Sequence, residues 1–400
     1  MPSTTSSLNT YSILMKTYSR INESSDVEIS NGIELKVLML VTKLNFGGTE
    51  NYILSMSRML RKHGAKVGIA AKKGPLSHLF SKAGIKLHLM PKDKNENLTS
   101  SLSSLMIKEK YNLIHAHDSK TFVIAASIAQ KLNIPFIATV HGTYHKKAAL
   151  SAAARAAKKM ITVSPKLTKW LLDQKVTAQK IRMIPNGIDL RTFHPITDSG
   201  KWKMALRFKR YTSLLVYAGR FSKDKYRIAR NVILAAERIA IKNPQFVALL
   251  IGPGSRRVKL VKLANQINRR LRRKAILIRP AMFNIQQAYA AADIVVGTGR
   301  VAIEAMACGK PVVAIGVAGY SGTVRKQNIN KMIQYQFGDH GALSKLSVAK
   351  LTKDIRSLLG NPMKARKMGD FNAKLAQRKF SVQTTGSRML KVYKDEIRRN

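Results

Sequence analysis

Acidic residues are scarce in this sequence. Asp and Glu together number 21 against 71 Lys and Arg, which gives a formal net charge of +50, and none occurs between Glu237 and Asp293. A helix expected over 256–274 lies in that acid-free stretch and carries nine basic side chains beside an apolar face of Val, Leu and Ile. The imbalance indicates an anionic partner without identifying it.

Three interpretations of this charge stay open. The basic helix can be a solvated face, or it can approach anionic lipid head groups, where each basic residue contributes about 1 kcal/mol. Nucleic acid is the weakest of the three. No helix-turn-helix, zinc-finger or RNA-binding signature is present, and aromatic residues are only 6% of the chain and are not interleaved with basic runs. An anionic membrane surface is therefore the expected partner.

Cysteine and long apolar runs are almost as rare. The single cysteine, Cys308, supports neither a disulfide framework nor a thiolate metal site and is typical of a reducing compartment. No apolar run is long enough to span a bilayer. The first residues are rich in Ser, Thr and Asn without the basic start and apolar core of a signal peptide, so 1–35 is expected to be a flexible tail. We expect a cytoplasmic protein, peripheral on the inner face of the membrane.

Apolar residues, by contrast, make up 45% of 400 residues, enough for two cores. Short Val- and Ile-rich runs alternate with helical stretches in both halves, a pattern that predicts parallel βαβ units with right-handed crossovers. The alternation pauses over 184–213, which is interpreted as a linker. We expect a first domain over 36–200 and a second over 201–379. The predicted strands are 36–42, 67–70, 86–90, 113–116, 136–140, 160–163, 214–218, 246–251, 275–278, 293–296 and 311–315.

The stretch 292–315 (ADIVVGTGRVAIEAMACGKPVVAI) organises the second domain. It predicts a strand, a glycine turn at 297–299, a helix over 300–308 and a second strand. The helix N-terminus offers free N–H groups to an anion, and Glu304 on its second turn can accept hydrogen bonds from ribose hydroxyls. Arg220 and Lys225 follow another strand of the same sheet. Two cations near a ribose-binding acid indicate a nucleotide diphosphate.

Polar or glycine residues also follow strands of the first domain, where parallel sheets bind ligands. The pair Gly47-Gly48 lacks the spacing of a dinucleotide fingerprint, so it is either a phosphate-approach loop or a conformational turn. His115 and His117 alternate on one strand without a third ligand, which makes a metal site a weak interpretation. His141 ends the strand FIATV and is interpreted as a site residue rather than a core histidine.

Seven segments, in order, resemble a family 4 glycosyltransferase. The resemblance covers residue 36 to the C-terminus, and each segment is modest alone, but the series is specific. It implies the GT-B fold, an α/β architecture of two Rossmann-like, doubly wound parallel-sheet domains facing each other across a cleft, with a C-terminal helix within 380–400 completing the first. The segments are FGGTE (46–50), TVHG (139–142), VSPKL (163–167), IPNGID (184–189), AGRFSKDK (218–225), IGPG (251–254) and EAMACGKPVVA (304–314).

The resemblance implies a role for particular residues. Arg220 and Lys225 would grip the donor diphosphate and stabilise the leaving group, a task that other transferases give to a metal, so no metal and no cofactor are expected. Glu304 would hold the ribose hydroxyls, and His141 would lie near the donor sugar. The remaining donor-binding candidates are Gly47, Gly48, Asn186, Gly187, Gly252, Gly299 and Arg300.

One departure from the family pattern stands out. The family has a glutamate eight residues before the ribose-binding acid, and here that position is Val296. We expect the backbone N–H groups of the turn together with Arg300 to contact the donor sugar instead. The resemblance implies a configuration-retaining enzyme that uses a nucleotide-diphospho-sugar, with a UDP-sugar favoured, and transfers to a lipid-linked or cell-envelope glycan. The alternative is a catalytically weak nucleotide-sugar-binding or scaffold protein on an anionic membrane.

Overall fold

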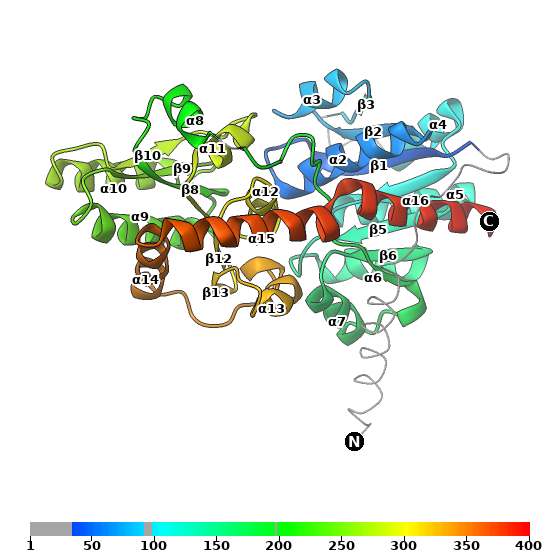
Figure 1. Ribbon diagram of the computed structural model, residues 1–400. Helices are drawn as coiled ribbons and strands as arrows, with labels where there is room; N and C mark the ends of the chain where they lie inside the picture. Colours follow the sequence, from blue (N-terminus) through cyan, green and yellow to red (C-terminus); the bar gives the residue numbers. More distant parts are fainter. Residues whose placement is uncertain (1–33, 92–97, 197) are drawn as a thin grey trace. The chain divides into compact units, whose positions relative to one another are not determined.

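The computed structural model describes residues 34–91, 98–196 and 198–400. These residues form two compact units: unit 1 comprises the chain up to Gly187 together with Val382–Asn400, and unit 2 comprises Ile188–Ser381 (Figure 1). The units therefore divide after residue 187 and again after 381, whereas the sequence placed the divisions after 200 and 379. The expected tail over 1–35 lies largely outside the described residues. Its last residue, Leu35, is buried in the core of unit 1.

Unit 1 is built on a seven-stranded parallel sheet in the order β3-β2-β1-β4-β5-β6-β7. The central strands β1, β4 and β5 are buried because helices cover both faces, which explains why they read as continuous apolar runs. The strands are β1 (Lys36–Lys43), β2 (Lys66–Lys72), β3 (Lys86–Leu89), β4 (Leu113–Ala116), β5 (Phe136–Val140), β6 (Lys159–Thr162) and β7 (Ile181–Met183). The helices are α2 (Gly48–Lys62), α3 (Ser77–Lys82), α4 (Leu98–Glu109), α5 (Ser119–Leu132), α6 (Lys147–Ala156), α7 (Pro165–Asp173), η1 (Ala178–Lys180) and α16 (Val382–Arg398).

The C-terminal helix α16 belongs to unit 1, as expected. Its Met389, Leu390 and Tyr393 are buried in the same apolar cluster as residues of α2 and β1. Gly386 allows α16 to lie close to α2, since a Cβ at this position would come 2.4 Å from Met59 Sδ. The last residues of the chain thus complete a core whose other members come from its first 200 residues.

Unit 2 is built on a six-stranded sheet in the order β10-β9-β8-β11-β12-β13. Five strands are parallel, but the edge strand β13 is antiparallel to β12 and was not predicted. The strands are β8 (Ser213–Ala218), β9 (Phe246–Ile251), β10 (Ile276–Arg279), β11 (Ile294–Gly297), β12 (Val312–Gly316) and β13 (Gly319–Thr323). The helices are α8 (Ser199–Ala205), α9 (Tyr226–Ala240), α10 (Arg257–Arg270), α11 (Ile285–Ala291), α12 (Gly299–Ala307), α13 (Ile329–Gln334), η2 (Gln336–Gly338), α14 (Val348–Leu359) and α15 (Pro362–Phe380).

The stretch 184–213, interpreted from the sequence as a linker, contains the division between the units after Gly187 and also a helix. Helix α8 lies within it, and its Lys203 is buried with Nζ 2.9 Å from both carboxylate oxygens of Asp293. Asp293 also accepts a hydrogen bond of 2.7 Å from the backbone N–H of Leu214. These interactions of Asp293 hold helix α8 against the first strand of the unit 2 sheet.

Both sheets have the doubly wound order that the sequence predicted, and this order positions the candidate site. The strand order reverses between β1 and β4 in unit 1 and between β8 and β11 in unit 2. Ligands of such sheets bind beyond the carboxyl ends of the strands at this switch point. Within the part of the chain that the structure describes, no helix combines the length and apolar character needed to cross a membrane.

Candidate functional site

The loop after β8 holds Arg220 and Lys225 at the switch point of unit 2. Arg220 is exposed, and among the described residues it makes no ion pair or hydrogen bond. Close backbone packing shapes this loop: a Cβ at Gly252 would lie 1.8 Å from the Gly219 carbonyl oxygen, so only glycine fits. Gly252, a donor-binding candidate, therefore acts through backbone packing that sets the course of the Arg220 loop.

The turn after β11 is the other side of this switch point. Gly299 has a φ of +53° at the start of α12, a conformation that favours glycine. Val296 pairs in register with Tyr217 of β8 and is fully buried, so its side chain cannot contact a ligand. Across the ranges that the structure describes, no side chain caps the N-terminus of α12 at Thr298, so the backbone N–H groups there are suited to an anion.

Arg300 and Glu304 contact each other in the interior of unit 2. Arg300 Nε donates a hydrogen bond of 2.7 Å to Glu304 Oε1, and the Tyr289 hydroxyl donates one of 3.4 Å to Glu304 Oε2. Each side chain of the pair is only 7% exposed. Burial raises the pKa of Glu304, and the nearby Arg300 guanidinium opposes that rise. The expected ribose contact of Glu304 and the expected sugar contact of Arg300 both stay predictions. In the structure these two side chains bond to each other.

A residue that the sequence did not indicate also lies at this corner. Asp339 follows η2, and its Oδ1 lies 3.6 Å from Lys225 Nζ. A Cβ at Gly299 would come 3.4 Å from Asp339 Oδ2, so the carboxylate lies beside the β11–α12 turn. No motif surrounds Asp339, and only the tertiary structure brings it to the two loops of the switch point.

In unit 1, histidines and tyrosines cluster beyond β4 and β5. His141 Nε2 lies 3.3 Å from His117 Nδ1, and its ring meets that of Tyr52 edge to face at 5.1 Å between centroids. His115 hydrogen bonds with the Tyr393 hydroxyl (2.5 Å) and with Thr139 Oγ1 (2.7 Å). Burial lowers the pKa of His115 to about 3 and that of His117 well below its usual value. Both imidazoles are therefore neutral.

This arrangement favours a packing role for His115 over the metal-ligand interpretation. Both its ring nitrogens are engaged by hydroxyl groups. Among the residues placed by the structure, no group of three or more His, Cys, Asp or Glu side chains has the arrangement needed to hold a metal ion. Asp118, which follows these histidines, caps α5 and accepts hydrogen bonds from the backbone N–H and hydroxyl of Thr42. It ties β1 to β4 rather than contacting a ligand.

The glycine candidates of unit 1 lie in two places: Gly47 and Gly48 follow β1 at the switch point, and Gly187 follows the edge strand β7. Gly47 precedes α2, where a Cβ would come 2.3 Å from Glu50 Oε2, and Gly48 is the first residue of that helix. Gly187 is required for packing, because a Cβ there would lie 2.0 Å from Thr385 Oγ1 of α16. Its neighbour Asn186 is buried, and within the described part of the chain its Oδ1 has no hydrogen-bond partner. A buried acceptor of this kind is suited to a ligand donor.

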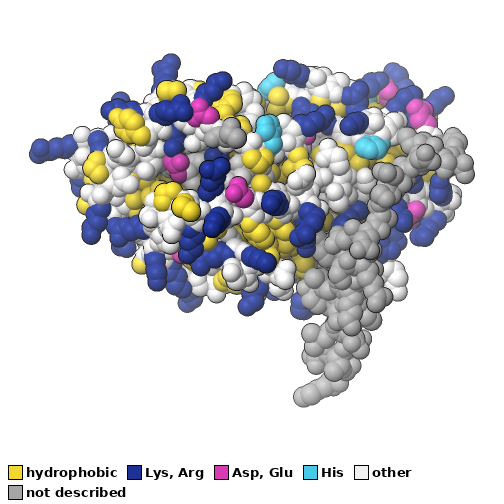
Figure 2. Space-filling model, viewed as in Figure 1, with side chains coloured by type: hydrophobic (Ala, Val, Ile, Leu, Met, Phe, Trp, Pro, Cys, Tyr) yellow, Lys and Arg dark blue, Asp and Glu magenta, His cyan; other side chains and the backbone are white. Residues whose placement is uncertain are grey.

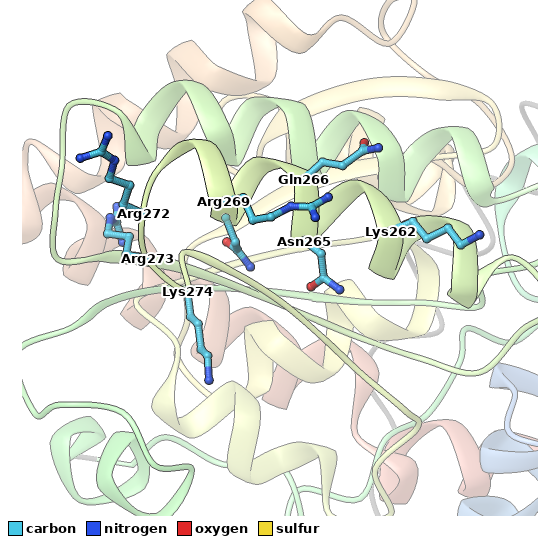
Figure 3. A pocket seen from close by; sticks show the side chains of 8 residues that line it. Lys262, Asn265, Gln266, Arg269, Arg272, Arg273 and Lys274 are labelled. Atoms are coloured by element: carbon cyan, nitrogen blue, oxygen red, sulfur yellow. The ribbon is translucent and has the colours of Figure 1, made fainter.

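A basic groove runs along α10 and the turn that follows it, at the edge of unit 2 (Figure 3). Its volume is about 810 Å³. Arg273 is structural, since its guanidinium donates to the carbonyl oxygens of Phe246, Ala240 and Asn243. Lining side chains that are exposed include Lys262, Asn265, Gln266, Arg269, Arg272 and Lys274. Figure 2 shows that Lys and Arg also cover the visible face far more densely than Asp and Glu.

Comparisons with known proteins agree with this fold. The model of Glycosyltransferase Family 4 matches residues 46–192, and that of Glycosyl transferases group 1 matches residues 198–375. HepE from Anabaena in complex with UDP and glucose has the same fold, with a TM-score of 0.73 at 21% identity over 90% of this chain and 100% of that one. The fold is GT-B, and the chain belongs to the family 4 glycosyltransferases.

Two curated relatives illustrate the family. One is the UDP-Gal:alpha-D-GlcNAc-diphosphoundecaprenol alpha-1,3-galactosyltransferase of Escherichia coli, 25% identical over 57% of this chain. That match spans 63% of the relative, less than two thirds of its length. The other is the D-inositol 3-phosphate glycosyltransferase of Xylanimonas cellulosilytica, 25% identical over 88% of this chain and 93% of the relative.

Proposed function

We propose that this protein transfers a sugar from a nucleotide-diphospho-sugar to a lipid-linked or cell-envelope glycan, with retention of anomeric configuration and without a metal. A UDP-sugar is the favoured donor. The observation that carries the proposal is the switch point of unit 2, where exposed Arg220, Lys225 and the N-terminus of α12 converge on the place where such sheets bind nucleotides. Three positive groups at one switch point suit a diphosphate.

The proposed chemistry follows from where negative charge develops. When the bond between the anomeric carbon and the donor phosphate breaks, the bonding electron pair leaves with the nucleotide diphosphate. Arg220 and Lys225 would stabilise that charge more strongly in the transition state than in the ground state, which is the requirement for catalysis. His141, held by Tyr52 and His117, would contact the donor sugar, and Asn186 would offer its buried oxygen to a donor hydroxyl.

The proposed acceptor rests on weaker support. The Escherichia coli relative is named for a diphosphoundecaprenol-linked acceptor. A lipid-linked acceptor requires the enzyme to work at a membrane surface, and the basic groove along α10 offers exposed cations to anionic head groups. We therefore extend the proposal to a peripheral position on the cytoplasmic face of an anionic membrane.

Calorimetric titration with UDP, GDP, ADP and their sugar conjugates, in buffer containing EDTA, tests the donor. We expect one UDP-sugar to bind with a clear preference and to raise the midpoint of thermal unfolding, since a ligand of the native state stabilises it. Incubating that donor with a lipid-diphosphate-linked sugar should then give a product whose anomeric configuration, read by NMR, equals that of the donor.

Two outcomes would contradict the proposal in different ways. Binding without turnover, unchanged by Arg220→Ala, would favour the scaffold alternative. Transfer that ceases in EDTA and returns with a divalent cation would contradict metal independence alone. Lys223→Ala is the matched control for Arg220→Ala, because Lys223 is an exposed cation of the same loop.

Vesicle flotation with and without phosphatidylglycerol tests the membrane position. Replacing Lys262, Arg269 and Lys274 by Glu should release the protein from anionic vesicles, and these three side chains are exposed, so the fold should persist. Arg270 and Arg273 are left intact because the first pairs with Glu237 and the second holds three carbonyl groups. The control replaces exposed Lys364, Arg366 and Lys367 of α15 by Glu. Equal release by both triple variants would show that net charge, not the groove, drives binding.

A further inference from the structure

The segment that carries Asp339 has an unusual backbone. Gln336, Phe337 and Gly338 have φ angles of +49°, +54° and +97°, so two non-glycine residues in succession occupy the left-handed region. Residues held in this region cluster at ligand-binding and catalytic sites, where surrounding contacts maintain the strain. The left-handed backbone of this segment therefore indicates that it holds a functional group in place.

Several contacts hold this backbone in place. The Phe337 ring is fully buried and packs against Phe380. The Thr298 hydroxyl of the β11–α12 turn donates a hydrogen bond of 3.0 Å to the Phe337 carbonyl oxygen. A Cβ at Gly316 would come 2.1 Å from the Gly338 carbonyl oxygen, so a glycine at the end of β12 permits the approach. The strained segment is thus fixed to the same turn that follows Val296.

Asp339 is the residue that this segment delivers to the switch point. Its Oδ1 lies 3.6 Å from Lys225 Nζ, and its Oδ2 lies 3.4 Å from the position of a Cβ at Gly299. The side chain is 28% exposed, so it is accessible to a ligand. A carboxylate beside a helix N-terminus is stabilised by the helix dipole.

We propose that Asp339 contacts the hydroxyl groups of the donor sugar and supplies the carboxylate that position 296 lacks. The inference rests on the proposed function, because it takes Lys225 as a diphosphate ligand. In a nucleotide sugar, the sugar is separated from the diphosphate by one ester oxygen. A carboxylate next to the diphosphate-binding lysine therefore lies where sugar hydroxyls arrive, and carboxylate oxygens accept hydrogen bonds from hydroxyl groups.

This assignment differs from a simple counter-ion role. A counter-ion would only neutralise Lys225 in the free protein, and a diphosphate would displace it. Removing a counter-ion should change the affinities for UDP and for a UDP-sugar by the same factor. Removing a sugar contact should weaken the UDP-sugar alone, because free UDP offers no sugar hydroxyl.

The test compares UDP with UDP-galactose, UDP-glucose and UDP-N-acetylglucosamine on the full chain by calorimetry. We expect Asp339→Asn to bind UDP at least as tightly as the wild type, since a negative charge near the diphosphate is removed. Its affinity for the UDP-sugar that the wild type prefers should fall on the order of 10- to 100-fold relative to UDP, the range of a charged hydrogen bond. Turnover of that donor should fall in parallel.

Asp224→Asn is the matched control, because Asp224 is an exposed carboxylate of the Arg220 loop and the charge change is the same. Its ratio of UDP to UDP-sugar affinity should stay at the wild-type value. Asp339→Ser provides a second variant without the amide, and its unfolding midpoint shows whether the segment is intact. Asp339→Glu, which keeps the carboxylate, should restore part of the UDP-sugar affinity.

Three results would overturn the assignment. An unchanged affinity ratio in Asp339→Asn would reduce Asp339 to a counter-ion. Equal weakening of UDP and UDP-sugar with a lower unfolding midpoint would make it a structural residue. A wild-type protein that binds no nucleotide sugar would contradict the proposed function itself, and this assignment with it. The first two results leave the proposed function standing.

Discussion

The two units share a plan but differ in the chemistry at their switch points. In unit 1, neutral imidazoles, tyrosines and a threonine hydroxyl gather beyond β4 and β5, with His115 and His117 almost fully buried. In unit 2, charged groups gather beyond β8 and β11, and they include the exposed Arg220 and the buried Arg300–Glu304 pair. The same doubly wound architecture thus carries neutral hydrogen-bonding groups at the switch point of unit 1 and charged groups at the switch point of unit 2.

The difference shows that the fold fixes where ligands bind but not what binds. The carboxyl ends of parallel strands supply the place in both sheets. The residues after each strand then decide whether a diphosphate or a neutral hydroxylated group suits the crevice. The proposed donor site follows from the charges of unit 2, whereas the imidazole and hydroxyl groups at the switch point of unit 1 are uncharged hydrogen-bonding groups.

The largest expected effect is selective acid unfolding of unit 1. His115, His117 and His145 have pKa values lowered mainly by burial, to about 3 for His115 and about 4 for His145. Because these folded values lie below the unfolded one, the neutral imidazoles stabilise the unit fully above pH 6.5, and the stability falls as the pH drops. At pH 5 the stabilisation from His115 and that from His145 should each have fallen by about 2 kcal/mol, and His117 should change in the same direction. Hydrogen exchange at pH 7.5 and pH 5 should show faster loss of protection in β4 and β5 than in β8 and β11, and uniform loss in both units would contradict the comparison.

The buried ion pair of unit 2 gives the next effect. Arg300→Leu leaves the Glu304 carboxylate buried without its cation, which should lower the free energy of unfolding by about 3–5 kcal/mol at pH 7.5. The pKa of the Glu304 carboxyl group in the folded variant should rise further above its value in the unfolded chain. The loss of stability should therefore be largest at high pH and should shrink as the pH falls and the carboxyl group becomes protonated. Denaturant unfolding measures both. The double variant Arg300→Leu/Glu304→Gln should recover most of the stability, and a double variant as unstable as the single one would show that packing matters more than charge.

Arg220→Ala should separate catalysis from stability. We expect turnover of the preferred UDP-sugar to fall on the order of 10²- to 10³-fold, as when one transition-state donor is removed. The unfolding midpoint should not change, because Arg220 is exposed. Lys223→Ala, on the same loop, should keep wild-type turnover in the same assay. A similar decrease in both variants would mean that the loop's general charge matters rather than the position of Arg220.

The smallest effect concerns the link between α16 and the unit 1 sheet. Tyr393→Phe removes the hydroxyl that bonds His115 and should lower the free energy of unfolding by about 1–1.5 kcal/mol. Thermal unfolding measures the change. Tyr211→Phe, at an exposed tyrosine of unit 2, should have no effect. Equal midpoints in all three proteins would show that the His115–Tyr393 contact does not stabilise the unit.

Much of the fold could be predicted because it depends on local patterns. The strand expected at 36–42 appears as Lys36–Lys43, and the helix expected at 300–308 appears as Gly299–Ala307. Short Val- and Ile-rich runs separated by helical stretches allow few alternatives to a parallel sheet. The antiparallel β13 escaped prediction because GYSGT has two glycines and little apolar character. Helix α8 was missed because its seven residues show no apolar periodicity; the Asp198 cap and the ion pair of Lys203 with Asp293 hold it.

The sequence by itself determined the family, the two doubly wound sheets and the positions of Arg220, Lys225 and His141 after their strands, since each of these depends on residues close together in the chain. Only the tertiary structure decided the partners of the candidate residues. It paired Arg300 with Glu304, placed Tyr393 on His115 across 278 residues, and brought Asp339 to Lys225. The physical reason is that burial fixes which charged and polar groups meet, and burial depends on contacts between residues far apart in the sequence.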